Sequence, residues 1–496
     1  MRSSPTMFTR AALTNAALTV MLWAAGCAAE PRFLRPLHTR AASNETVFAF
    51  DTDDDKRADF WQYQGPDGRK AAVAYADPSG QPGPRISLDD IRAADCPHFV
   101  IALDGVPFEL VDELYRAGQF RLFYPPARVI CCFPGMTDLA LAELFHCGPC
   151  EAYQALHFDR QANRVVSGNS GYLAATNSPW VSKMNYRCSF WWDALAYLRP
   201  QTVFQHELNG IARTFRQIAS GQACAYSVGT AGLGTRGGAA AIRQYLRTID
   251  RLCEQIVYER RGRVKLTLLA DHGHNLVRNR RVSFRDTLRA AGYGESQSLR
   301  GPGDVVVIAY GLVTYAEVFT RDPAGVAECL AGHEDVEFVC YRSGPAIIVQ
   351  DRTGRAWIRK GAGGFYYEPR GSDPLKLVPI LERLRQDRKI AFDGEIDDRA
   401  LFEATLDHYY PDPLARIWRA FHVLARNPPD VIVNLRDGAC HGSRFFDFMI
   451  GGADSTHGSL NRRNSTTFAL TMLGELPPAL RASDVLPALE HLRRQP

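Results

Sequence analysis

The 496-residue chain has little excess of either charge, since 58 lysines and arginines stand against 54 aspartates and glutamates. A formal net charge of +4 on this length gives no electrostatic reason to expect a nucleic-acid partner. The sequence also lacks a dense basic stripe interleaved with aromatics, internal repeats, and low-complexity tracts beyond a polar amino-terminal segment. With 46% hydrophobic residues it can bury a sizeable core, as one large domain with insertions or as two domains.

Long apolar runs are missing as well, except near the amino terminus, and nothing later resembles a transmembrane helix. Arg2 and Arg10 precede an apolar stretch, residues 11–25, that is too short to span a bilayer comfortably. It ends on Ala-Ala-Gly-Cys27, which is typical of a lipobox whose cysteine becomes lipidated, although ordinary cleavage near Ala29 remains an alternative. We therefore predict an exported protein, periplasmic or at the cell surface, tethered to the membrane only by lipid on Cys27.

The single CxxC pair, Cys147 and Cys150, has no second pair beside it to complete a four-cysteine zinc site. A local disulfide or two buried thiols is the favoured interpretation, and in an oxidising compartment other cysteines can also pair.

Polar residues follow several apolar runs at the point where each run ends. The run 264–270 stops on Asp271, His272 and Gly273, and the run 98–103 stops on Asp104. In open α/β sheets, the carboxyl ends of strands are where sites usually lie. Thr137 falls at a loop-to-helix junction, which suits a helix cap. It equally suits a hydroxyl nucleophile beside a cation, with helix amides ready to hold a phosphate.

Four segments in chain order resemble the alkaline phosphatase superfamily, and most of all its type I phosphodiesterase and nucleotide pyrophosphatase branch. They are Leu-Asp104-Gly-Val-Pro, Phe-Pro-Gly-Met-Thr137, Ala-Asp271-His272-Gly and Thr-His457-Gly-Ser-Leu. The resemblance covers roughly residues 97–315 and 428–489. It implies an α/β sandwich, a largely parallel sheet between helices, with an inserted cap region. It also implies two metal ions, usually zinc, and a threonine that the substrate's phosphorus transiently esterifies.

Carried across by motif, the resemblance assigns one metal to Asp104, Thr137, Asp271 and His272. The second metal would keep only His457, because Ala231 and Thr235 stand where the family has an aspartate and a histidine. One imidazole should not hold zinc at ordinary concentrations. We therefore expect one intact divalent-metal site, most suited to zinc with manganese or magnesium less so, and a degraded second site.

Three consequences of the degraded site stay open. The protein could work with one metal, with His457, His274 or Arg236 supplying hydrogen bonds and charge. It could recruit replacement ligands such as His274 or His206, or it could bind without turnover. Each candidate has an ordinary alternative, since a turn histidine points to solvent, a glycine-flanked arginine lies on the surface, and His206 fits a plain helix.

The sequence predicts five segments: a signal peptide (1–27), a polar extension (28–96), the first part of the core (97–321), a cap (322–429) and the second part of the core (430–496). The run 430–435 is expected to rejoin the core sheet. The predicted function is an exported, metal-dependent phosphoester hydrolase, phosphodiesterase-like, with Thr137 as nucleophile and a small-molecule phosphoester as substrate. A catalytically silent binding protein and a one-metal phosphotransferase are the alternatives.

Overall fold

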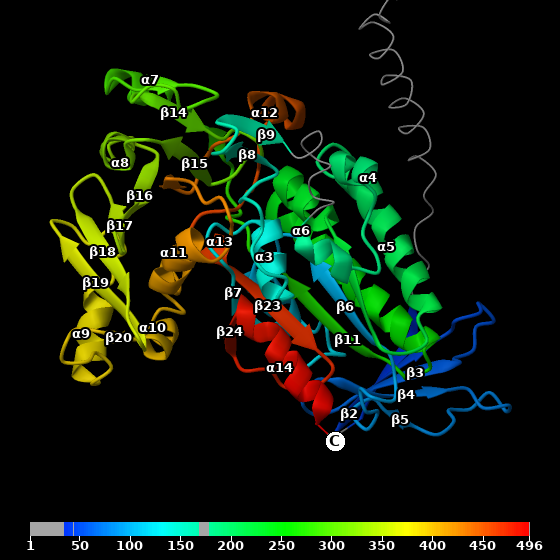
Figure 1. Cartoon of the computed structure of the whole chain (residues 1–496). Helices are drawn as coiled ribbons and strands as arrows, with labels where there is room; N and C mark the ends of the chain where they lie inside the picture. Colours follow the sequence, from blue (N-terminus) through cyan, green and yellow to red (C-terminus); the bar gives the residue numbers. More distant parts are fainter. Residues whose placement is uncertain (1–33, 43, 168–177, 496) are drawn as a thin grey trace, which may run out of the picture.

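The computed structural model describes residues 34–42, 44–167 and 178–495. The predicted signal peptide and Cys27 lie outside these ranges. Three large sheets organise the described chain: a five-stranded sheet near the amino terminus, a six-stranded core sheet and a nine-stranded sheet (Figure 1). Two short ribbons accompany them, one pairing β8 (Leu156–Asp159) with β9 (Arg164–Ser167), the other β12 (Arg280–Arg281) with β22 (Ala439–Cys440).

The core sheet is largely parallel, as predicted. Its strands are, in spatial order, β10 (Gln222–Ser227), β6 (His98–Leu103), β11 (Lys265–Ala270), β23 (Thr466–Thr471), β7 (Ala127–Ile130) and β24 (Ala479–Arg481). Strand β6 pairs in parallel with both β10 and β11, and β24 pairs in parallel with β7. Because β23 is antiparallel to both of its neighbours, it alone among the six runs against the others.

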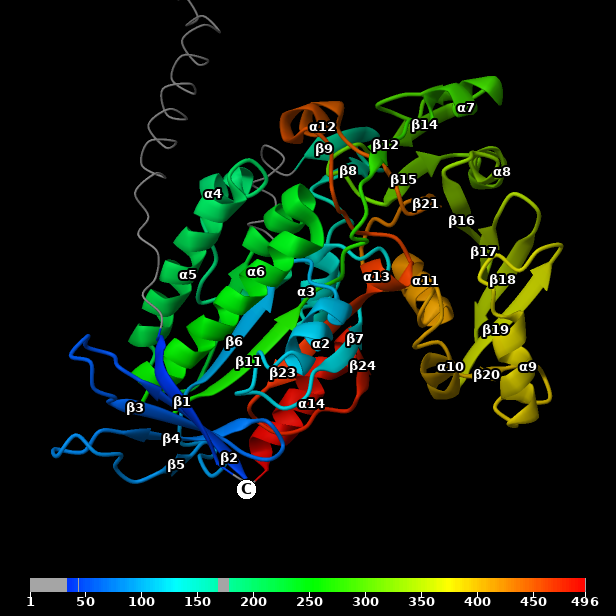
Figure 2. The same ribbon diagram turned by 180° about the vertical axis from the view of Figure 1, so that it is seen from behind.

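Helices cover both faces of the core sheet. Successive residues of a strand point to opposite faces, so alternate residues of β6 pack against different helices. On β6, Phe99 and Ile101 pack with α2 (Phe108–Arg116), α5 (Pro200–Gln217) and α6 (Gly229–Glu259). Val100 and Ala102 face the other layer, with α3 (Thr137–Leu144) and α14 (Ala482–Arg494). The predicted α/β sandwich is therefore confirmed, and its layers are visible from both sides (Figures 1 and 2).

The predicted polar extension forms an antiparallel sheet at one end of the core (Figure 2). Its strands are β1 (Pro36–Ala42), β2 (Glu45–Phe50), β3 (Phe60–Gln64), β4 (Lys70–Tyr75) and β5 (Ile86–Ser87). Phe60 lies at its centre, with its ring centroid 5.1 Å from that of Tyr75 and 5.2 Å from that of Tyr258 on α6. The amino-terminal sheet therefore shares a hydrophobic core with one helical layer of the sandwich.

The nine-stranded sheet stands beside the sandwich. Its order is β13 (Gly294–Glu295), β14 (Asp304–Val307), β15 (Tyr315–Thr320), β21 (Val431–Leu435), β16 (Val336–Ser343), β17 (Ala346–Gln350), β18 (Arg355–Lys360), β19 (Gly364–Arg370) and β20 (Ile396–Asp397). The expectation that residues 430–435 rejoin the core sheet is wrong, because β21 pairs with β15 and β16. An apolar run buried on both faces fits any internal strand, so its pattern does not name its neighbours. The boundaries of the five predicted segments stay a prediction.

Shorter helices complete the chain. They are η3 (Pro179–Lys183), α4 (Phe190–Leu195), α7 (Arg285–Ala290), α8 (Pro323–Ala331), α9 (Val378–Gln386), α10 (Asp398–Ala404), α11 (Pro413–His422), α12 (Arg444–Ile450) and α13 (Arg462–Ser465). Buried Arg416 connects α11 to two loops next to the site. Its guanidinium donates to the carbonyl oxygens of Cys132 (3.0 Å) and Leu460 (3.3 Å). These two residues belong to the loops that carry Thr137 and His457.

Of the helices in the described ranges, none is long and apolar enough to cross a membrane. The described cysteines carry free thiols, including Cys147 and Cys150, so the structure has the two-thiol form of this pair.

Glu317 on β15 is a buried carboxylate with no cationic partner in the described part of the chain, and this makes stability depend on pH. Its side chain accepts hydrogen bonds from Gln154 (2.8 Å) and Tyr315 (3.0 Å), and burial raises its pKa to about 7. A raised pKa contributes stability below the unfolded value near 4.5, and this contribution is lost as pH rises through about 7. Glu317→Gln should therefore stabilise the protein at pH 8 by up to about 3 kcal/mol and leave it unchanged at pH 4. Urea unfolding from pH 4 to pH 8 measures this change in the free energy of unfolding, and Glu382→Gln, at an exposed position, is the matched control. An equal stabilisation by Glu317→Gln at both pH values would contradict the prediction.

Candidate active site

Two neighbouring strands of the core sheet end on acidic residues. Because Leu103 of β6 lies opposite Ala270 of β11, the residues that follow them, Asp104 and Asp271, lie side by side. Asp271 Oδ1 accepts the backbone N–H groups of Gly105 (2.9 Å) and His272 (2.8 Å), which fixes the direction of its carboxylate. Asp104 Oδ2 accepts the hydroxyl of Tyr226 from β10 at 2.6 Å. Each carboxylate is thus held by one oxygen, and the other oxygen is free to face the site.

The free oxygens surround one ring nitrogen. His272 Nε2 lies 3.3 Å from Thr137 Oγ1, 3.4 Å from Asp271 Oδ2 and 3.6 Å from Asp104 Oδ1. Ligands about 2.0 to 2.2 Å from a tetrahedral zinc lie roughly 3.3 to 3.6 Å from one another. The three distances from His272 Nε2 are therefore those expected between ligands of a single tetrahedral ion.

The same oxygens lack any hydrogen-bond partner among the described residues. Asp104 Oδ1 and Asp271 Oδ2 are both fully buried atoms with nothing to accept from. Burial raises the pKa of Asp271 to about 6, and burial together with the charge of Asp271 raises the pKa of Asp104 well above its ordinary value. Two adjacent buried carboxylates are costly unless a cation compensates them. The predicted ligand set Asp104, Thr137, Asp271 and His272 therefore fits a divalent metal ion.

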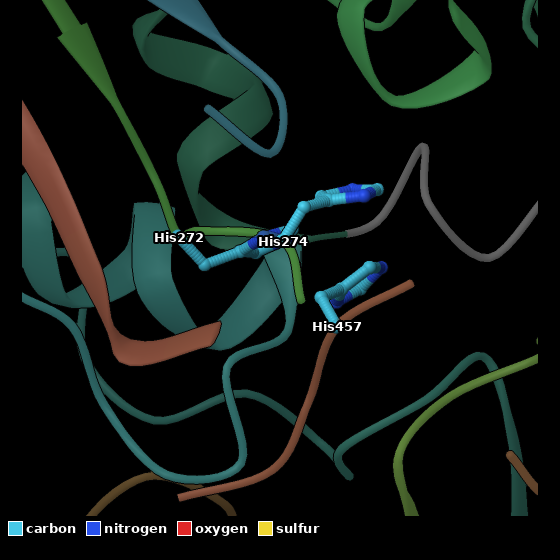
Figure 3. Close-up of side chains that lie close together, drawn as sticks. All are labelled: His272, His274 and His457. Atoms are coloured by element: carbon cyan, nitrogen blue, oxygen red, sulfur yellow. The ribbon is translucent and has the colours of Figure 1, made fainter. Parts of the chain in front are cut away.

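Three imidazoles meet at this position: His272, His274 and His457 (Figure 3). The ring centroids of His272 and His457 are 3.9 Å apart and nearly parallel, and those of His274 and His457 are 5.3 Å apart. Burial lowers the pKa of His272 to about 4 and that of His457 to about 3, so both rings are neutral near pH 7. His274, for which a solvent-facing position was the alternative, is instead completely buried within the cluster.

Thr137 is the first residue of α3, as the sequence predicted. The residue before it, Met136, occupies the N-cap position and makes no side-chain cap. The Thr137 hydroxyl therefore serves no capping role and lies instead beside His272. The first N–H groups of a helix have no partner within the helix, so this end can receive phosphoryl oxygens.

The segment that contains Ala231 and Thr235, where the resembled family has metal ligands, is helical. Helix α6 runs over Gly229–Glu259 with a break at Gly238 (φ 55°, ψ −150°). Glu207 stabilises the start of this helix, because its carboxylate accepts the backbone N–H groups of Val228 and Gly229, both at 2.9 Å. Ala231 and Thr235 are buried on this first part of α6, one helical turn apart.

The remaining candidates lie apart from the three imidazoles. Arg236 is exposed on α6. His206 stacks on Trp192, with ring centroids 4.0 Å apart. The structure thus brings together Asp104, Thr137, Asp271, His272, His274 and His457, whose catalytic and ligand roles stay predictions.

A cavity of about 170 Å³ opens onto Thr137, Asp104 and His457. Aromatic side chains line much of it: Tyr153, Trp180, Tyr197, Tyr226, Tyr310 and Phe446. Asp138, Arg187 and Asp193 add polar groups, and Asp138 accepts the Trp180 indole N–H at 2.8 Å. The nucleophile candidate therefore faces a concave, partly aromatic chamber rather than open surface.

Sequence reasoning missed several residues that shape this site. Tyr226 holds Asp104, Ser455 contacts His274, and Phe446 on α12 lines the cavity. Tyr226 is the last residue but one of β10, and its place beside β6 was a usable signal. Ser455 and Phe446 sit in loop or short-helix positions that carry no periodic pattern.

No family model matches the chain, and no curated protein sequence matches it. Solved structures similar to it include phosphonoacetate hydrolase from Sinorhizobium meliloti 1021, in complexes with phosphonoformate and with phosphonoacetate. Each is 12% identical, covers 84% of this chain and 98% of that chain, and has a TM-score of 0.43. Murine ectonucleotide pyrophosphatase/phosphodiesterase 5 is 11% identical, covers 80% of this chain and 94% of that chain, and has a TM-score of 0.40.

Proposed function

We propose that the chain is a metal-dependent phosphoester hydrolase, phosphodiesterase-like, in which Thr137 is the nucleophile. The observation that carries the proposal is the set of three distances, 3.3, 3.4 and 3.6 Å, from His272 Nε2 to Thr137, Asp271 and Asp104. Three oxygen atoms thus lie around one ring nitrogen at distances that suit a shared ion, and one of them belongs to Thr137, which lines a cavity. Oxygen and imidazole ligands together suit zinc.

A divalent ion bound there would lower the pKa of the Thr137 hydroxyl and compensate charge on the phosphoryl oxygens. The Thr137 oxygen attacks phosphorus, its bond to phosphorus forms, and the ester bond to the leaving alcohol breaks. The alcohol departs with a proton, and the threonine carries the phosphoryl group. Water then attacks the same phosphorus, the Thr137–phosphorus bond breaks, and the hydroxyl is restored. The amino end of α3 offers backbone N–H groups to the phosphoryl oxygens throughout.

The test combines a metal count with pre-steady-state kinetics. Protein stripped by a chelator and then reloaded with zinc should hydrolyse an aryl phosphodiester only when reloaded, with a burst of aryl alcohol that equals the enzyme concentration. A well-folded protein that binds no ion and shows no turnover would support the silent binding protein instead. Transfer of the phosphoryl group to an added alcohol in place of water would support a phosphotransferase.

The aromatic lining of the cavity favours a substrate whose leaving group is a flat ring, because stacking on aromatic side chains is favourable. Phe446 is half-buried on α12 and packs edge-on against Tyr197, with centroids 5.2 Å apart. Phe446→Ala should raise KM for an aryl phosphodiester roughly tenfold, on the scale of one lost stacking contact. Phe448→Ala on the same helix is the matched control, because that ring is 82% exposed. Equal effects of the two substitutions, or an unchanged ratio of aryl to alkyl substrates, would argue against the stacking role.

We also propose that the mature protein is exported and lipid-anchored through Cys27, on the sequence features of residues 1–27. Cys27→Ser should move the protein from the membrane fraction to the soluble fraction. An unchanged membrane fraction would rule out the lipid on this cysteine.

A further inference from the structure

Two imidazoles remain unused after the ion of the proposed function has taken its ligands. The ligand nitrogens of His272, His274 and His457 lie within 4.8 Å of one another. His272 Nε2 already belongs to the group with Asp104 and Asp271. His274 and His457 therefore lie beside the same small space, and the first ion uses neither of them as a ligand (Figure 3).

The hydrogen bonds of the two rings decide which nitrogen carries the proton. His457 Nδ1 is 2.8 Å from the carbonyl oxygen of Gly135, which can only accept, so Nδ1 donates and Nε2 keeps its lone pair. His274 Nδ1 is 3.0 Å from Ser455 Oγ. That hydroxyl accepts the backbone N–H of Leu276 at 2.9 Å and donates toward Asn275 Oδ1 at 3.4 Å. With its proton turned toward Asn275, the hydroxyl accepts from His274 Nδ1–H, and in this tautomer His274 Nε2 also keeps its lone pair.

His274 Nε2 is a fully buried atom with no hydrogen-bond partner among the described residues. A histidine whose Nδ1–H is fixed by an acceptor, with Nε2 bare, has the arrangement of a metal ligand. Two such nitrogens belong to a group with His272, and His272 also belongs to the group with Asp104 and Asp271, whose Oδ1 and Oδ2 atoms, respectively, have no hydrogen-bond partner among the described residues. A tetrahedral cation takes four ligands, so the ion held by Asp104, Thr137, Asp271 and His272 leaves these two nitrogens without an ion.

The chain provides the space that the His274 ring occupies. A Cβ atom at Gly105 would lie 2.5 Å from His274 Nε2, and one at Gly234 would lie 3.4 Å from His274 Nδ1. Gly234 lies on the first part of α6, between Ala231 and Thr235, the two small residues at the family's lost ligand positions. The ring of His274 thus lies against the helical segment from which ligand side chains are missing.

We propose that His274 and His457 together bind a second divalent cation beside the first, with His274 replacing the ligands that Ala231 and Thr235 lack. The proposal rests on the proposed function for its first ion. Imidazole nitrogens suit zinc, and His457 lines the cavity, from which water or a phosphoryl oxygen could complete the coordination. Two neutral imidazoles bind an ion more weakly than a set with two carboxylates, so the second ion binds in a separate and weaker step.

Equilibrium titration of the metal-stripped, full-length protein with zinc tests the proposal, with bound metal counted by elemental analysis. The wild type should bind two ions in two steps, whereas His274→Gln and His457→Gln should each bind one, with the tighter step changed less than threefold. Inorganic phosphate should tighten the weaker step at least tenfold in the wild type and have no such effect in His274→Gln. Cobalt(II), whose visible absorption reports its ligands, gives a second readout that does not depend on activity.

His98→Gln is the matched control, because His98 is also a buried, neutral histidine but begins β6 at the end opposite Asp104. It should bind two ions as the wild type does. One ion per chain in a wild type that turns over would overturn the second site and leave the proposed function intact. Two ions in His274→Gln would likewise overturn the role of His274, and no bound ion at all would remove the proposed function itself.

Discussion

Thr137→Ala should lower kcat/KM for an aryl phosphodiester by on the order of 10³-fold or more and abolish the burst, while Thr137→Ser retains both. The alanine variant loses the only atom that can attack phosphorus in this mechanism. It keeps Asp104, Asp271 and His272, so it should still bind the first ion. The affinity should be lower, because the Thr137 oxygen is no longer a ligand. A serine restores a hydroxyl at the same position on the first turn of α3.

Rapid-quench kinetics and intact-protein mass spectrometry measure this outcome together. An adduct of phosphorus on the protein should accumulate in the wild type and be absent in Thr137→Ala. Metal content of each variant, measured in the same preparations, separates loss of the nucleophile from loss of the ion. A burst that persists in Thr137→Ala would show that another residue carries the phosphoryl group, and Thr137 would then be a ligand only.

The parts of the site that the sequence predicted are those encoded by local pattern. Asp104, Asp271 and His272 follow directly on apolar runs that can only be buried strands, so their place at the sheet edge follows from the strands. Thr137 follows a proline- and glycine-containing turn before a helical stretch, and the helix begins on it. Because parallel neighbouring strands end together, the meeting of these residues was also predictable.

The parts that the sequence did not predict depend on contacts between distant segments. His274 is buried because Gly105, from another strand end, leaves room for its ring. No pattern around His274 itself carries that information. The same holds for β21, whose apolar run fits either sheet and whose place is decided by β15 and β16. Local pattern therefore predicts which residues stand at strand ends, and tertiary packing decides which turn residues join them.

Asp271→Asn should remove the first ion and with it most of the metal-dependent turnover, without unfolding the protein. Asparagine keeps an oxygen that can accept the N–H groups of Gly105 and His272, so the turn after β11 retains its hydrogen bonds. The substitution takes away one of two buried carboxylates, each of which has an oxygen with no hydrogen-bond partner among the residues that the structure describes. The metal-free variant should therefore melt at least as high as the metal-free wild type, because a buried charge is removed.

With zinc present, the wild type should melt at a higher temperature than Asp271→Asn. A ligand that binds only the folded protein stabilises it, and a tighter ligand stabilises it more. Zinc should raise the melting temperature of the wild type and have little effect on Asp271→Asn, whose affinity should fall on the order of a hundredfold or more.

Asp193→Asn is the control, since Asp193 lines the same cavity outside the ligand cluster and should keep the zinc-induced rise. A wild type that zinc does not stabilise would contradict the metal site, because the oxygens gathered around His272 Nε2 would then bind no ion. An Asp271→Asn variant that melts lower than the wild type in the absence of metal would instead show that the carboxylate is compensated within the protein. In that case the pair of acids would need no cation, and the spacing around His272 would reflect hydrogen bonding alone.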